Sequence, residues 1–90
     1  MNMNIPEYWQ NLTPRRRLND AVHRYAKAHG GDYRQAWRHL EKIYSLTYRI
    51  DVRAERRLYA EKYGTLPTIP VWFEMQGIMD RVITLALSMP

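Results

Sequence analysis

Arginine is the residue of this chain whose type and spacing could do chemistry. Eleven of the 14 cationic side chains are arginine, and residues 15–62 hold 13 of these 14 but only six of the nine acids. A planar guanidinium donates paired hydrogen bonds to phosphate or carboxylate, whereas lysine offers a point charge. A basic domain with a net charge of +5 indicates an anionic partner, and nucleic acid is the first candidate. The alternative is a soluble domain with a charged surface.

The first cluster is Arg15, Arg16 and Arg17, which directly follows Pro14. At a helix start, the free backbone N–H groups and the helix dipole already attract anions. Three arginines there could clamp a phosphate. The other interpretation is a solvated basic turn that Asp20 partly neutralises.

The second cluster is Arg34, Gln35 and Arg38. It follows Gly30 and Gly31, which separate two amphipathic segments as the turn of a helix-turn-helix does. Arginine and glutamine pair bidentately with base edges, so Gln35 is a candidate base reader. An ordinary αα-hairpin is the alternative. With a third cluster near residue 55, the expected contacts to nucleic acid or another anionic partner are Arg15, Arg16, Arg17, Arg34, Gln35, Arg38, Arg53, Arg56 and Arg57.

Other kinds of site are not indicated. The chain has no cysteine, which excludes disulfides and thiolate metal sites. Its three histidines (His23, His29 and His39) lack metal-site spacing, and no nucleophile-and-base pattern, phosphate loop or carboxylate pair is present. We therefore expect no enzyme, no cofactor, no metal and no small-molecule substrate.

The hydrophobic spacing predicts a compact, all-α, four-helix domain over residues 1–90. This domain must position the arginine clusters. Thr13 before Pro14, Asp32 with Gln35, and Asp51 are helix-start signals, whereas glycines 30 and 64 are end signals. The expected helices span about 14–29, 33–47, 52–63 and 70–89, after an irregular lead-in over 1–13.

The last predicted helix is long and hydrophobic, with two apolar faces where a small core needs one. We therefore expect a homodimer, or docking onto a partner protein, with a central helix wrapped by the other three as the alternative. The expected protein interface consists of Leu66, Pro67, Ile69, Pro70, Trp72, Met75, Met79 and Ile83.

One stretch of the sequence resembles a known family. Leu18-Asn19-x-x-Val22, Asp32-Tyr33-x-x-Ala36-Trp37-x-x-Leu40-x-x-x-Tyr44 and Ile50-Asp51-Val52 are similar to the helical C-terminal region of phage antirepressor-type regulators over about residues 15–52. In that family a DNA-associated module precedes the helical domain, and we expect this chain to act without that module. The resemblance implies a free-standing phage accessory protein, and it transfers no contact residues.

The chain shows no secretion signal, and Glu74, Asp80 and Arg81 interrupt its longest apolar stretch, so we expect no membrane span and a location in the cytoplasm of a bacterial host. Two functions survive. We favour a non-enzymatic accessory protein that binds and modulates a host regulatory or DNA-processing protein. The alternative is a basic, helix-turn-helix-like regulator that binds nucleic acid.

Overall fold

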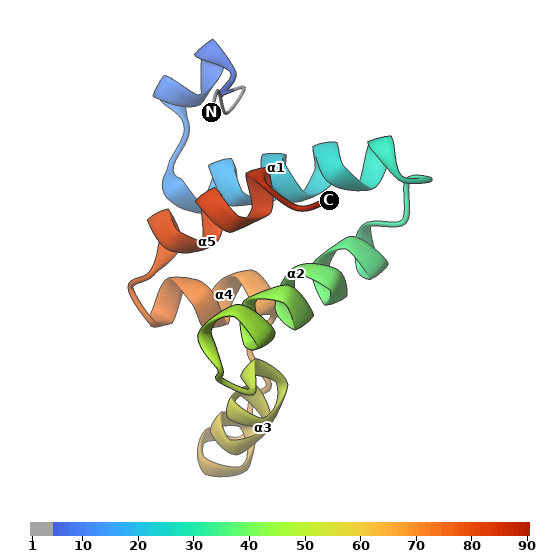
Figure 1. Cartoon of the computed structure of the whole chain (residues 1–90). Helices are drawn as coiled ribbons and strands as arrows, with labels where there is room; N and C mark the ends of the chain where they lie inside the picture. Colours follow the sequence, from blue (N-terminus) through green and yellow to red (C-terminus); the bar gives the residue numbers. More distant parts are fainter. Residues whose placement is uncertain (1–4) are drawn as a thin grey trace.

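The computed structural model describes residues 5–90, and every regular element in that range is helical (Figure 1). The all-α prediction is therefore confirmed. A 3-10 helix, η1 (Glu7–Asn11), precedes five α-helices: α1 (Pro14–Ala28), α2 (Tyr33–Tyr48), α3 (Val52–Tyr63), α4 (Ile69–Met75) and α5 (Met79–Leu87). The predicted count of four helices is wrong because the last predicted helix is divided into α4 and α5.

Side-chain caps fix the starts of α1, α2 and α3. The side-chain oxygens of Thr13, Asp32 and Asp51 each accept a hydrogen bond from the backbone N–H three residues later, at 3.3, 3.0 and 3.0 Å. Each bond satisfies one of the donors that a helix N-terminus leaves free. The caps expected from the sequence are present because they depend on local residues alone.

The expected continuous helix over 70–89 is wrong, because the chain turns between α4 and α5. Gly77 has a left-handed φ of +70°, a conformation that residues with a Cβ rarely adopt. The N–H of Gly77 bonds the carbonyl of Glu74 at 3.1 Å, which ends α4. The turn redirects α5, so the apolar residues of both segments reach the same core.

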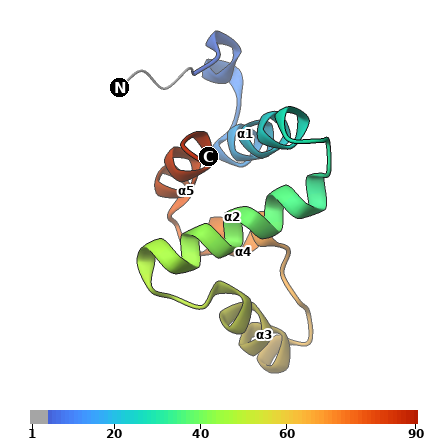
Figure 2. The same cartoon turned by 45° about the vertical axis from the view of Figure 1, so that its right-hand side comes forward.

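The core lies between α1 and the helices around it. Figures 1 and 2 show α5 lying alongside α1, with α2 and α4 below them. Trp72 and Ile83 are only 5% and 8% exposed, so the chain itself covers them. The apolar excess that motivated the expected dimer or docking partner is therefore largely buried within one chain. The largest fully buried side chains are Phe73, Leu18, Leu40, Val22, Val52 and Val82.

The lead-in is more ordered than expected. Its residues 1–4 lie outside the described part of the chain, but residues 7–11 form η1, and the indole of Trp9 is buried. Asp20 of α1 accepts two hydrogen bonds through Oδ2, from the Trp9 indole and from the Tyr8 hydroxyl, both at 2.6 Å. Arg17 Nε donates to the Trp9 carbonyl at 2.9 Å. These bonds fasten η1 onto α1.

The helix α3 projects from the rest of the molecule. Both views place it at the end opposite α1 and α5, and the molecule measures 40 Å along its longest axis against 26 and 23 Å (Figures 1 and 2). Val52 is the buried residue of α3. Such an isolated 12-residue helix depends on a few specific contacts for its position.

Across residues 5–90, no helix is both long and apolar enough to cross a lipid bilayer.

Candidate functional site

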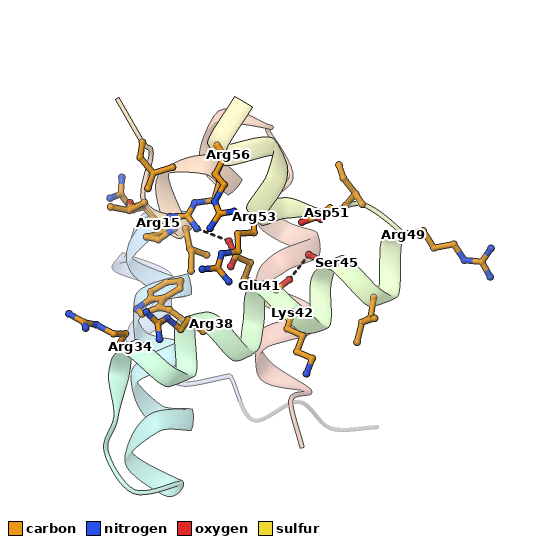
Figure 3. Close-up of a pocket in the computed structure, with 18 residues that line it drawn as sticks. Arg15, Arg34, Arg38, Glu41, Lys42, Ser45, Arg49, Asp51, Arg53 and Arg56 are labelled. Carbon is orange, nitrogen blue, oxygen red and sulfur yellow. Dashed lines mark hydrogen bonds and ion pairs between the residues drawn. The ribbon is translucent and has the colours of Figure 1, made fainter. Parts of the chain in front are cut away.

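A groove of about 1270 Å³ lies between α2, the first half of α3 and residues 66–70 (Figure 3). This volume exceeds the roughly 300–1,000 Å³ of sites for small molecules. We call it the basic groove. Its lining consists of Arg15, Arg34, Trp37, Arg38, Glu41, Lys42, Ser45, Leu46, Arg49, Ile50, Asp51, Arg53, Arg56, Arg57, Leu66, Thr68, Ile69 and Pro70.

Two rows of side chains on α2 form one wall of the basic groove. Residues four apart lie on the same face of a helix. The outer row is exposed and consists of Arg34, Arg38, Lys42 and Leu46, whereas the inner row is more buried and consists of Trp37, Glu41 and Ser45. The cations of this wall therefore stand at its exposed rim, above a more buried inner row.

The opposite wall is α3, and Arg56 fixes its position. Arg56 Nη1 lies 2.7 Å from Glu41 Oε2, and Arg56 Nε donates to the Pro67 carbonyl at 2.9 Å (Figure 3). The side chains of Arg56 and Glu41 are only 14% and 11% exposed. One guanidinium thus connects α2, α3 and the segment that leads to α4. Its role is structural.

Ser45 adds a second connection between α2 and α3. Its hydroxyl donates to the Glu41 carbonyl at 2.8 Å and accepts from the Val52 backbone N–H at 3.2 Å. The first turn of α3 is therefore hydrogen-bonded directly to α2. Both walls of the basic groove are held at their junction.

The basic groove has a strong excess of positive charge. Eight lining residues are Arg or Lys, and two are acidic. Both carboxylates are already engaged, because Glu41 pairs with Arg56 and Asp51 caps α3. Arg15 forms a 3.2 Å ion pair with Glu74, but both side chains are exposed, so that pair is weak. The walls of such a groove focus a positive field that attracts anions.

Within residues 5–90, six of the lining cations make no ion pair or side-chain hydrogen bond: Arg34, Arg38, Lys42, Arg49, Arg53 and Arg57. Figure 3 shows Arg34 and Arg49 at opposite ends of α2, with Arg38, Lys42 and Arg53 between them. Among the described residues, these side chains can therefore contact a ligand without breaking an ion pair or a side-chain hydrogen bond.

The structure brings together six of the nine predicted anion contacts: Arg15, Arg34, Arg38, Arg53, Arg56 and Arg57. The other three lie outside the basic groove. Arg17 holds η1, whereas Arg16 and Gln35 are exposed elsewhere. Gly30 and Gly31 do form the expected turn between α1 and α2. However, α3 stands beside the exposed face of α2, so that face does not project freely as the reading helix of a helix-turn-helix does.

The predicted protein interface is dispersed. Leu66, Ile69 and Pro70 line the basic groove, and Met75 is exposed elsewhere. Pro67, Trp72 and Ile83 are buried, and Met79 is partly buried. Only this first part of the predicted protein interface therefore lies in the same groove as the predicted anion contacts.

The sequence-based set lacked Lys42, Leu46 and Arg49. The signal for Leu46 was present, because it continues the exposed row of Arg34, Arg38 and Lys42 at the same spacing. Arg49 follows α2 with a left-handed φ of 54°, where glycine would be usual. No comparable signal showed that α3 would face this row.

Metal chemistry has no support in this region. No group of three or more His, Asp or Glu side chains within residues 5–90 could hold a metal ion. The positive charge of the basic groove would also repel one.

No family model, curated protein or solved structure matches the chain. The resemblance to phage antirepressor-type regulators stays a prediction.

Proposed function

We propose that this chain binds nucleic acid through the basic groove and has no catalytic role. The observation that carries the proposal is that eight cationic residues, from α1, α2, α3 and the turn after α2, line one groove whose two carboxylates are already engaged. Phosphate backbones supply regularly spaced negative charges for such a surface. Because seven of the eight cations are arginine, paired hydrogen bonds to phosphate oxygens are favoured.

The protein-partner function loses its main support. It depended on an uncovered apolar face of the last helix, and α5 and α4 bury Ile83 and Trp72 inside the chain. A protein that filled the basic groove would need a dense acidic surface. Nucleic acid meets the same requirement along its whole length.

Binding of labelled oligonucleotides, followed by fluorescence anisotropy at low and high salt, tests the proposal. We expect affinity at low salt and a steep loss with salt, because each contacted phosphate releases counterions. The double variant Arg34→Gln/Arg38→Gln removes two groove cations that make no ion pair in the described chain, and we expect about a tenfold loss of affinity.

The matched control is Arg24→Gln/Lys27→Gln, which removes the same charge from exposed positions of α1 outside the basic groove. We expect the control to bind almost as the unchanged chain does. Equal losses in the two variants would mean that net charge, and not the groove, attracts the ligand. No binding to any oligonucleotide at low salt would overturn the proposed function.

A further inference from the structure

The basic groove contains apolar surface that phosphates alone would not use. Leu46 and Leu66 are 71% and 53% exposed, and both line the groove beside the arginines. The indole of Trp37 lies between the cationic residues Arg34 and Arg38 in sequence and is partly buried in the groove wall. A ligand that presents both negative charge and apolar faces would therefore use more of this groove than phosphates alone.

The shape of the groove disfavours a DNA duplex. A helix that reads a duplex is about 10–12 Å wide and must enter a major groove about 12 Å wide, so it has to project alone. Here α3 stands beside the cationic face of α2, which makes that face concave. The exposed charged residues of α3 outside the groove are Glu55, Glu61 and Lys62, so the outer face of α3 carries no excess of positive charge to attract duplex phosphates.

We propose that the basic groove binds an unpaired nucleic-acid strand, with phosphates at the arginine rim and bases on the surface of Trp37, Leu46 and Leu66. This inference rests on the proposed function and names its substrate class. A single strand offers both the charged backbone and the exposed base faces, whereas a duplex keeps its bases stacked inside. Stacking of bases on aromatic side chains is the usual way in which such strands are held without sequence preference.

The length of the groove sets the length of the strand. From Arg34 to Arg49, α2 rises about 22 Å at roughly 1.5 Å per residue. That distance corresponds to about six nucleotides of a stacked strand at roughly 3.4 Å each. Affinity should therefore rise with oligonucleotide length up to about six to eight nucleotides and increase only slowly beyond that.

The first test compares ligands on the unchanged full chain. Fluorescein-labelled oligothymidylate, a mixed-sequence single strand and its duplex of the same length are titrated at low salt, with polyglutamate as a polyanion without bases. We expect the two single strands to bind at least about tenfold more tightly than the duplex and polyglutamate.

The outcomes separate the two proposals. A duplex that binds as tightly as the single strands would overturn the inference and leave the proposed function standing. Polyglutamate that binds as tightly as the single strands would overturn the inference, because bases would contribute nothing. No binding by any of the nucleic acids would overturn both.

The second test uses Trp37 as a reporter. Trp9 and Trp72 are buried and do not line the basic groove, so Trp37 is the tryptophan there. Base stacking should quench its fluorescence when oligothymidylate binds, and Trp37→Leu should remove that quenching and weaken binding by about five- to 150-fold.

A milder variant guards against misfolding of Trp37→Leu, since Trp37 also packs against the core. Leu46 is mostly exposed, so Leu46→Ser should fold normally and weaken single-strand binding by about threefold or more. Leu58→Ser, at an exposed position of α3 outside the groove, is the control and should bind normally. If Leu46→Ser binds like Leu58→Ser and tryptophan emission does not change on binding, the inference is wrong.

Discussion

Arg56 shows why the role of a charged residue depends on its surroundings. In sequence it belongs with Arg53 and Arg57, and all three line the same groove. In the structure Arg56 alone is largely buried and paired with Glu41. A buried pair contributes little net stability, but the loss of one partner leaves an uncompensated charge.

Arg56→Met should therefore lower the free energy of unfolding by about 2–3 kcal/mol. Arg57→Met, the exposed neighbour, should change it by less than about 0.5 kcal/mol. The double variant Glu41→Leu/Arg56→Met should recover most of the loss, because no charge is then left unpaired. Urea unfolding measures all three. Equal stability of the two single variants would contradict the assigned role of the ion pair.

The Tyr8 hydroxyl makes the attachment of η1 sensitive to alkaline pH. The pKa of Tyr8 is raised above its ordinary value of 10.0, chiefly because the hydroxyl donates a hydrogen bond to the Asp20 carboxylate. A raised folded-state pKa means that the contribution to stability is complete below pH 10 and is lost as the pH rises through the folded-state value.

Tyr8→Phe should therefore be less stable than the unchanged chain near pH 9, and the difference should shrink toward pH 11. Thermal unfolding at the two pH values measures this difference. Tyr33→Phe, at an exposed tyrosine without a side-chain hydrogen bond in the described chain, should show no such convergence. A difference between Tyr8→Phe and the unchanged chain that stays constant with pH would rule out the hydrogen bond as its source.

At the scale of the elements, the starts of α1, α2 and α3 were predictable, and the break between α4 and α5 was not. Thr13, Asp32 and Asp51 act within a single turn, so the sequence alone reveals them. The turn at Gly77 was missed because the hydrophobic spacing continues across it without a change of phase. Periodicity reports which residues are buried, but it does not report whether one straight helix buries them.

The residue that follows α2 is unfavourable for stability but lies in the basic groove. Gly64 directly follows α3 and adopts the left-handed conformation without strain, whereas Arg49 directly follows α2 at φ 54°. A side chain there is less favourable than glycine by about 1 kcal/mol. Arg49 also lines the basic groove, so its charge offers a functional reason for its presence.

Arg49→Gly should therefore raise the free energy of unfolding by up to about 1 kcal/mol while it weakens oligonucleotide binding. If Arg49 contacts one phosphate, the slope of the logarithm of affinity against salt should fall by about 0.7 for a single strand. Arg49→Lys should retain most of the binding, which distinguishes charge from backbone effects. A variant that is more stable and binds normally would remove Arg49 from the site.

At the scale of the whole molecule, the composition of the candidate site was partly predictable, but its geometry was not. The arginine clusters near residues 15, 36 and 55 are visible in the sequence, as is their excess over acids. Their convergence depends on how α3 is set against α2, which the contacts of Arg56 and Ser45 with Glu41, Pro67 and Val52 determine. Those pairs are 7 to 15 residues apart in sequence, and no local pattern indicates them.

The turn at Gly77 between α4 and α5 bears on whether the protein forms a dimer. A Cβ at this position would meet no other atom within 4 Å, so Gly77→Ala would strain only the left-handed backbone, by roughly 1–2 kcal/mol. A chain that straightened here would carry α5 beyond the reach of its own α1, and Val82 and Ile83 would lose their cover. The α1 of a second copy could then supply it, in an exchange of C-terminal helices.

Gly77→Ala should accordingly show a larger dimer fraction than the unchanged chain at equal concentration, as measured by light scattering. Identical masses for the two proteins across a dilution series would contradict this view. An increased dimer fraction would identify Gly77 as the residue whose backbone conformation keeps α5 packed on α1 of its own chain.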